Sequence, residues 1–386
     1  MVTEMTALAT ADKLYQNYCS RAQELSKQGK KIIGYLCAMT PVEIITAAGF
    51  IPFRIKGDVN EPISKADTQM ETIVCPLVRS CYDMTLKGNY NILSGLVIPH
   101  ACDSICRTYD IWKNTIDLPY THLIDTPHST DVSSMVFFKN ILNIFKQSLG
   151  KYAGKEITDD VLRQAVKKYN ENRAAVRRLF ELRKLDPPPI KGSEITRILV
   201  ASMSIPVDES IRMLNGIIDE VKKRTQIAMK KSPRIMIVGA QVDDAAFVKI
   251  IEDAGASVVI DDLCPGTREF WADTPVTADP IDGLAERYLT GVKCGRTYRE
   301  QKVPYDEYQQ DRFGHIGDFI KDFKVDGVIL YIYKYCDPFG FEIPALKDYI
   351  QKSETPVLYL EDEYSMSSIG RLTTRVQAFL EILESK

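Results

Sequence analysis

The stretch KIIGYLCAMTPVEIITAAGFIPFRI, residues 31–55, decides the fold of this chain. It begins with an apolar run of strand length at 31–36 and ends with a second one at 51–55. The segment between them has the length and the end signals of a short helix. A strand, a helix and a second strand in this order predict two parallel strands of one sheet, with the helix on its face.

The ends of this first helix carry recognisable signals. Thr40 and Glu43 have the spacing of a capping box, in which each side chain accepts a hydrogen bond from the backbone N–H of the other residue. Pro41 then occupies the first helical position, and Gly49 is the expected stop. We therefore expect the helix to begin at Thr40 and to end before Gly49.

The same alternation continues outward along the chain. Further apolar runs of strand length are found at 95–100, 121–126, 234–240, 257–262, 327–333 and 356–362. The middle of the chain is helical instead: residues 157–184 have an apolar stripe at helical spacing, with Thr158 as the expected N-cap. A proline-rich break follows this helix, and then a second helical stretch at about 205–230.

These patterns predict an α/β fold with two three-layer domains, each with a parallel sheet, and a helical segment between them. We expect an N-terminal α/β domain at 1–140, a helical segment at 141–230 and a C-terminal α/β domain at 231–386. No short repeat or low-complexity tract interrupts this plan.

Composition excludes several classes of protein. The 386 residues are 45% hydrophobic and 26% charged, as in an ordinary globular protein, and the net charge is −3. Such a balance gives no positive field for nucleic acid, so we expect no nucleic-acid partner. The N-terminus does not resemble a secretion signal, and no apolar run is long enough to span a bilayer. We therefore expect a cytoplasmic protein with no membrane partner.

The nine cysteines are the residues with the clearest chemical potential. A reducing cytoplasm disfavours disulfides, so the simplest interpretation is small buried apolar side chains. Three of them, however, follow predicted strands: Cys37, Cys102 and Cys336. Ligands of open parallel sheets bind at the carboxyl ends of strands. If the two domains face each other, Cys102 and Cys336 meet in the crevice between them. Cys75 lies in a loop just before the helix that leads to the third predicted strand.

The spacing of the cysteines does not decide whether they pack in the core or bind a metal, because no CxxC pair or ferredoxin pattern is present. The chain also has no P-loop, no GxGxxG after a strand and no GxSxG elbow. Two further catalytic candidates remain. His100 is either a hydrogen-bond donor to a cluster or substrate, or a half-buried loop histidine. Glu361 belongs to an acidic run at the end of 356–362, which is either solvated or has one member facing the cleft.

Long motifs around these cysteines resemble the 2-hydroxyacyl-CoA dehydratase / benzoyl-CoA reductase family. The motifs are GYLCAMTPVEIITAAGFIPFRI, VCPLVRSCYDMTLKG, GLVIPHACDSICRTYDIWK, GVILYIYKYCDPFGFEIP and VLYLEDEYSMSSIGRLTTRVQAFLE. The similarity extends over essentially the whole chain, and it is greater to the smaller, second subunit of the dehydratases. It implies two Rossmann-like domains plus a helical part, with a [4Fe–4S] cluster between the domains.

The resemblance also implies ligands and a mechanism. Position by position, the family's three cluster cysteines match Cys75, Cys102 and Cys336, and three ligands leave one iron with an open position. The family adds one electron to the thioester carbonyl of a 2-hydroxyacyl-CoA. The resulting ketyl radical expels the 2-hydroxyl group, and the enoxy radical that follows has a more acidic C3 proton. The electron is then returned, so one electron serves many turnovers.

The implied partners are a paralogous dehydratase subunit, a separate ATP-hydrolysing iron–sulfur activator and the acyl-CoA substrate. One alternative is a subunit of an ATP-dependent reductase of benzoyl-CoA type, which shares the three cysteines. Another is a double-cubane cluster reductase, whose additional ligands resemble Cys37 and Cys294. That group has a further cysteine where this chain has Ala240, so one expected ligand is missing.

Two interpretations remain for comparison. We expect the four other cysteines to be structural: Cys19, Cys81, Cys106 and Cys264. A non-catalytic module that closes two α/β domains on a small ligand needs no cluster, and the same architecture hosts many functions. Colourless protein with free thiols would distinguish such a module from an iron–sulfur enzyme.

Overall fold

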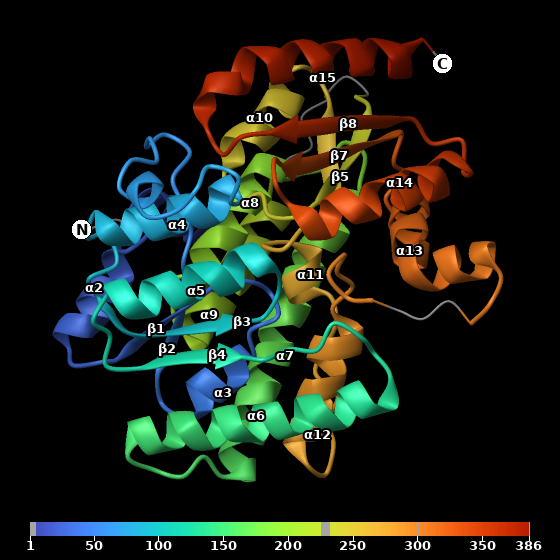
Figure 1. The fold of residues 1–386 in the computed structure, drawn as a ribbon. Helices are drawn as coiled ribbons and strands as arrows, with labels where there is room; N and C mark the ends of the chain where they lie inside the picture. Colours follow the sequence, from blue (N-terminus) through green and yellow to red (C-terminus); the bar gives the residue numbers. More distant parts are fainter. Residues whose placement is uncertain (1–4, 225–231, 299–301, 386) are drawn as a thin grey trace.

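The computed structural model describes residues 5–224, 232–298 and 302–385. Within them the chain forms two four-stranded sheets whose neighbouring strands all run parallel (Figure 1). All eight predicted strands are confirmed, and so is the α/β class. The first sheet has the order β2-β1-β3-β4 and the second the order β6-β5-β7-β8. The bounds are β1 (Ile32–Tyr35), β2 (Ile51–Arg54), β3 (Leu93–Pro99), β4 (Thr121–Ile124), β5 (Arg234–Gly239), β6 (Ser257–Asp262), β7 (Gly327–Tyr333) and β8 (Val357–Asp362).

The central strands are buried on both faces because each sheet has a layer of helices on either side. Every residue of β1, β5 and β7 is buried, which explains why these strands are continuous apolar runs rather than alternating ones. The strand order reverses direction between β1 and β3 in the first sheet, and between β5 and β7 in the second. These two points are where parallel sheets leave a crevice at the carboxyl ends of their strands.

The N-terminal sheet is covered by α4 (Pro76–Leu86) and α5 (Asp103–Thr115) on one face. The other face is covered by α3 (Val42–Ala47) and α6 (Val132–Ala153), as Figure 1 shows. Two short helices, α1 (Ala7–Gln16) and α2 (Ser20–Lys27), precede the sheet. The helix α6 crosses residue 140, and the predicted domain boundaries at 140 and 230 stay predictions.

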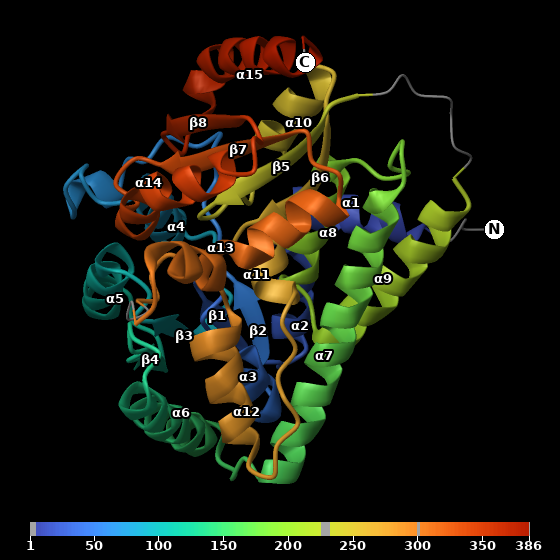
Figure 2. The same ribbon diagram turned by 90° about the vertical axis from the view of Figure 1, so that its right-hand side faces the viewer.

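The predicted helical middle is confirmed as far as the structure describes it. It consists of α7 (Asp159–Glu181), α8 (Gly192–Ser202) and α9 (Val207–Lys222). The hydroxyl of Thr158 accepts from the backbone N–H of Val161, which confirms the expected cap. Helices α7 and α9 lie side by side along one flank of the molecule (Figure 2). Residues 225–230 of the predicted second stretch lie outside the described residues.

The C-terminal sheet has α8, α10 (Ala245–Asp253) and α15 (Ile369–Glu384) on one face. Its other face carries α11 (Thr267–Phe270), α13 (Tyr305–Asp322) and α14 (Asp337–Gln351). The segment after α11 returns to the first sheet, where α12 (Pro280–Glu286) packs on α6. Shorter turns complete the chain: η1 (Ala66–Thr68), η2 (Leu182–Lys184), η3 (Arg287–Gly291) and η4 (Met366–Ser368).

The predicted capping box of α3 is wrong. The helix begins at Val42 with Pro41 as its N-cap, and the hydroxyl of Thr40 donates to the carbonyl oxygen of Leu36 at 2.8 Å. Glu43 does not turn back to the helix end, because its carboxylate is fully buried and accepts from Arg173 at 2.5 Å. A long-range ion pair has thus replaced the local cap.

The predicted end of α3 is confirmed. The helix ends at Ala47, and Gly49 adopts a φ of 89°, which favours glycine because other residues meet a steric clash there. Across the described parts of the chain, none of the helices has the length and apolar character that a bilayer crossing requires.

Candidate functional site

A cavity of about 90 Å³ lies where the carboxyl ends of the two sheets meet. Five loops that directly follow strands contribute to its wall: those after β1, β3, β5, β6 and β7. This is the position expected for a ligand of parallel sheets, and here two strand-order reversals face one another. Seven of the nine cysteines line it: Cys37, Cys75, Cys81, Cys102, Cys264, Cys294 and Cys336.

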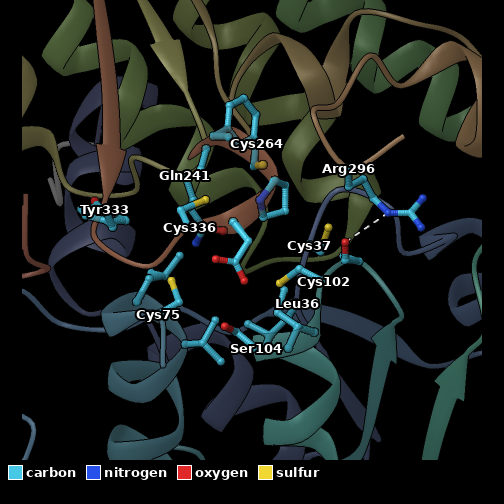
Figure 3. A pocket seen from close by; sticks show the side chains of 18 of the residues that line it. Leu36, Cys37, Cys75, Cys102, Ser104, Gln241, Cys264, Arg296, Tyr333 and Cys336 are labelled. Atoms are coloured by element: carbon cyan, nitrogen blue, oxygen red, sulfur yellow. Dashed lines mark hydrogen bonds between the residues drawn. The ribbon is translucent and has the colours of Figure 1, made fainter. Parts of the chain in front are cut away.

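Three of these cysteines occupy the same place relative to a helix. Cys75 is the N-cap residue of α4, Cys102 that of α5 and Cys336 that of α14. Figure 3 shows the three side chains around one open space, although they come from both halves of the chain. They are the three cysteines that the resemblance to the family implies as ligands, and the structure places all three on one cavity.

Helix N-termini suit thiolates because the partial positive charge of the helix end and its free N–H groups favour an anion. Burial works in the opposite direction and raises the pKa of Cys102 to about 12. Burial also raises the pKa of Cys75 and of Cys336, and the thiol of Cys75 raises the pKa of Cys336 further. Backbone amides of α4 at Leu77 and Val78 partly offset this for Cys75.

The electrostatics of the cavity therefore favour neutral thiols unless a cationic group is bound among them. A bound metal inverts this preference, since its charge deprotonates the thiols that ligate it. Within residues 5–224, 232–298 and 302–385, no three Cys, His, Asp or Glu side chains are arranged to hold a single metal ion. The thiols line a cavity instead, and cysteine thiolates are the ligands that iron–sulfur clusters take in proteins.

The remainder of the wall is mostly apolar, with few polar groups. The apolar side chains beside the thiols are those of Leu36, Leu77, Val78, Ile105 and Phe339. Gln241 adds an amide whose orientation is fixed, because its Oε1 accepts from Arg54 at 3.1 Å and its Nε2 donates to Asp243 at 2.9 Å. The polarity and burial of such a lining tune the potential of a bound redox centre.

Arg296 joins the two halves of the molecule beside the cavity. Its guanidinium donates to the carbonyl oxygens of His100 at 3.1 Å, Ala101 at 3.2 Å and Thr126 at 3.0 Å. The first two residues directly precede Cys102, and Thr126 follows β4. Figure 3 shows Arg296 beside the cavity, with one of these hydrogen bonds as a dashed line. Sequence reasoning missed Arg296, because it lies in a loop without a local pattern.

The structure also brings Cys37 and Cys294 to this cavity, together with Cys264, which we expected to be structural. Cys264 lies two residues after the end of β6, as Cys37 lies two residues after the end of β1. The same signal that marked Cys37, Cys102 and Cys336 was therefore present for Cys264. Cys81, on α4, also lines the cavity, whereas Cys19 and Cys106 do not.

The two candidate catalytic residues lie apart from the described cavity lining. The ring of His100 contacts Asp125, with Nδ1 3.1 Å from Oδ1, and packs edge-on against His128. Glu361 is exposed on β8, while its neighbour Asp362 is buried and accepts from Arg371 at 2.8 Å. A catalytic role for His100 or Glu361 stays a prediction.

Comparison with known proteins adds an independent line of argument. The family model described as 2-hydroxyglutaryl-CoA dehydratase, D-component, matches residues 37–383, a range that includes all seven cavity cysteines. The chain is 26% identical to the (R)-phenyllactyl-CoA dehydratase beta subunit of Clostridium sporogenes, over 94% of each chain. It is 26% identical to one of the subunits of the benzoyl-CoA reductase of Thauera aromatica, over 96% of each chain. It is 24% identical to the beta subunit of the (R)-2-hydroxyglutaryl-CoA dehydratase of Acidaminococcus fermentans, over 92% of this chain and 93% of that one.

Proposed function

The chain belongs to the 2-hydroxyglutaryl-CoA dehydratase D-component family, and we propose that it is the iron–sulfur subunit of a 2-hydroxyacyl-CoA dehydratase. One observation carries the proposal. Cys75, Cys102 and Cys336 are each the N-cap of a helix, they come from both halves of the chain, and they line one cavity. A cavity lined by thiols at helix N-termini is suited to thiolate ligation.

In this proposal, the three N-cap thiols hold a [4Fe–4S] cluster. When bound, the cluster supplies one-electron transfer at low potential, the chemistry needed to activate a thioester toward loss of its 2-hydroxyl group. The residues of the chain have simpler roles. Leu36, Phe339 and their apolar neighbours give the thiols an apolar wall. Arg296 holds the backbone that precedes Cys102 in place.

The proposed partners follow from the family and from the names of the relatives, which describe subunits of larger enzymes. We propose a paralogous second subunit, a separate ATP-hydrolysing iron–sulfur activator and an acyl-CoA substrate, all in the cytoplasm. Assembly with a second subunit gives the cluster either a substrate-binding or an electron-relaying role. A structure of the holoenzyme, with the partner subunit present and soaked with substrate, would decide between these two roles.

The test of the proposed reaction is the stoichiometry of the reductant. The chain, its paralogous subunit and the activator are purified together without oxygen, and a 2-hydroxyacyl-CoA is supplied with ATP and limiting reductant. We expect many molecules of 2-enoyl-CoA per electron. Cys336→Ser should abolish this activity, while Cys19→Ser, outside the cavity, should retain it.

A second candidate function is suggested by the relative from the benzoyl-CoA reductase of Thauera aromatica, which is similar to this chain over 96% of its length. A subunit of an aromatic acyl-CoA reductase uses the same three cysteines but consumes electrons with every turnover. Reductant consumption equal to product formation, with a ring-reduced thioester as product, would overturn the dehydratase proposal in favour of this one.

A further inference from the structure

Arg296 is the one arginine among the described residues that line the cavity, and it is only 5% exposed. Its hydrogen bonds in the described part of the chain all go to carbonyl oxygens, those of His100, Ala101 and Thr126. Its Nη1 atom is buried and has no hydrogen-bond partner among the described residues. A guanidinium stays charged in a protein, so Arg296 places a buried positive charge beside the cavity without bonding to a carboxylate.

Two other buried arginines each donate a hydrogen bond to a residue of the cavity wall, but both have a counter-ion. Arg54 forms a buried ion pair with Glu269 at 3.1 Å. Arg268 forms a second one with Asp262 at 2.9 Å. The opposite charges of each pair largely cancel at the distance of the cavity, whereas no described carboxylate cancels the charge of Arg296 in this way.

The groups that interact most strongly with the charge of Arg296 are thiols of the cavity. Burial lowers the pKa of Arg296, and the largest opposing causes are the thiols of Cys294 and Cys37. The thiol of Cys102 is the next of these causes. All three cysteines line the cavity. The charge of Arg296 is therefore directed at the space in which thiolates and a bound group would carry negative charge.

The other charged residue on the described cavity wall, Asp337, lies in a different environment. It is exposed, and it is the first residue of α14. Water and salt screen the charge of an exposed carboxylate, whereas a buried charge keeps most of its effect over short distances. We therefore expect Arg296 to contribute more than Asp337 to the electrostatic potential inside the cavity.

The sign of this contribution matters for redox chemistry. One-electron reduction of a bound cluster adds one negative charge to the cavity. A fixed positive charge nearby stabilises the reduced state more than the oxidised state, and it thereby raises the reduction potential. Without that charge, the same cluster would be harder to reduce.

We propose that the positive charge of Arg296 raises the reduction potential of the bound cluster and so helps the cavity to hold the transferred electron. This inference rests on the proposed function, since it takes the cluster as given. Arg296 acts on the cluster through space, as a positioning residue for the electron. This electrostatic role is distinct from its hydrogen bonds to the backbone before Cys102.

The test separates the charge from the hydrogen bonds with two variants, purified without oxygen. Arg296→Gln removes the charge but keeps an N–H donor, while Arg296→Lys keeps the charge but lacks the planar fork of the guanidinium. The reduction potential is measured by a titration followed by EPR. We expect Arg296→Gln to lower the potential by about 59 mV or more, a tenfold change in the ratio of reduced to oxidised cluster. Arg296→Lys should stay nearer to the wild-type value.

Arg107→Gln is the matched control. Arg107 lies on α5, the helix that Cys102 caps, but it is exposed and paired with Asp103 and Asp110. The substitution removes the same charge from the same region where water screens it, so we expect an unchanged potential. Melting temperatures of the apoproteins report on the structural role. Both variants of Arg296 lose backbone hydrogen bonds and should melt below the wild type, although only one shifts the potential.

Two results would overturn the proposal. Equal potentials in the wild type and in Arg296→Gln would show that the cluster does not respond to this charge. Equal shifts in Arg296→Gln and Arg296→Lys would show that the hydrogen bonds set the potential instead.

A variant without a cluster still gives an answer. If Arg296→Gln holds no iron after reconstitution with iron and sulfide, the iron content of Arg296→Lys decides: iron retained there supports the role of the charge, and iron lost in both variants contradicts it. The proposed function fails by other observations. It fails if the wild type holds no iron, or if Cys75→Ser, Cys102→Ser and Cys336→Ser all keep theirs.

Discussion

The Nε atom of Arg296 donates a hydrogen bond to the carbonyl oxygen of Ala101 at 3.2 Å, directly before Cys102. One loop of the C-terminal half thereby fixes a ligand loop of the N-terminal half. The same guanidinium reaches His100 and Thr126, so one side chain holds the ends of β3 and β4 together. The position of Cys102 relative to Cys336 depends on this link between the halves.

Arg296→Met should therefore weaken both the fold and the site. It leaves three carbonyl oxygens without their donor, and we expect the free energy of unfolding to fall by about 2–4 kcal/mol. Iron content should fall as well, and Arg296→Lys should recover part of both. The control is Arg107→Met, on an exposed arginine paired with Asp103 and Asp110, which should change stability by at most about 0.5 kcal/mol. Unchanged urea unfolding in Arg296→Met would contradict this role.

The pair between Glu43 and Arg173 predicts a loss of stability in acid. Burial alone would raise the pKa of Glu43, but the charges of Arg173 and Arg287 and the hydroxyl of Tyr288 hold it below its ordinary value of 4.5. A carboxylate with a lowered pKa contributes stability above its unfolded pKa and loses it as pH falls through the folded one. The urea concentration at the midpoint of unfolding should thus be constant near neutral pH, and it should decrease as the pH is lowered below about 4.5.

Glu43→Gln should remove much of that acid dependence and destabilise the protein by about 3–5 kcal/mol near neutral pH, because it leaves Arg173 buried without its counter-ion. Glu24→Gln is the matched control, since the ion pair of Glu24 with Arg21 lies at the surface. The account of the buried pair fails if both variants unfold at the same urea concentration.

Gly239 should not tolerate a larger residue. A Cβ atom there would lie 1.8 Å from the carbonyl oxygen of Tyr331, on the neighbouring strand, so β5 and β7 would have to separate. We expect Gly239→Ala to destabilise the protein by more than about 3 kcal/mol and to lower its iron content, because Gln241 and Cys336 follow these two strands.

Gly340→Ala is the comparison for this substitution. It lies in α14, where an added Cβ meets no atom within 4 Å, and it should leave stability unchanged or raise it by up to about 1 kcal/mol. Thermal melts of the two variants measure the difference. Equal melting temperatures would show that the two strands can move apart without cost.

Much of the fold could be predicted from local signals. Eight apolar runs of strand length identified all eight strands, because parallel strands covered on both faces must be apolar throughout. Thr158 and Gly49 marked helix ends correctly, since each acts on its own backbone. The Thr40 and Glu43 cap was wrong because a buried arginine from α7 competes for the carboxylate, and no local pattern reports on a partner so distant.

The site could be predicted only in part. The positions of Cys102 and Cys336 after strands were visible, and the resemblance to the family supplied the third ligand, Cys75. Cys264 follows a strand too, but its place in the cavity depends on which loops face each other across the two sheets. No local sequence pattern indicates the role of Arg296 in the fold, because that role consists entirely of hydrogen bonds to backbone atoms far away in the sequence.

The central claim is that the N-cap thiols of α4, α5 and α14 hold an iron–sulfur cluster. The most direct measurement is iron and acid-labile sulfide per chain in protein never exposed to oxygen, for the wild type and for the triple variant Cys75→Ser, Cys102→Ser, Cys336→Ser. We predict that the triple variant lacks at least about four irons and four sulfides that the wild type holds. Equal iron in both proteins, or a colourless wild type without iron, would contradict the claim.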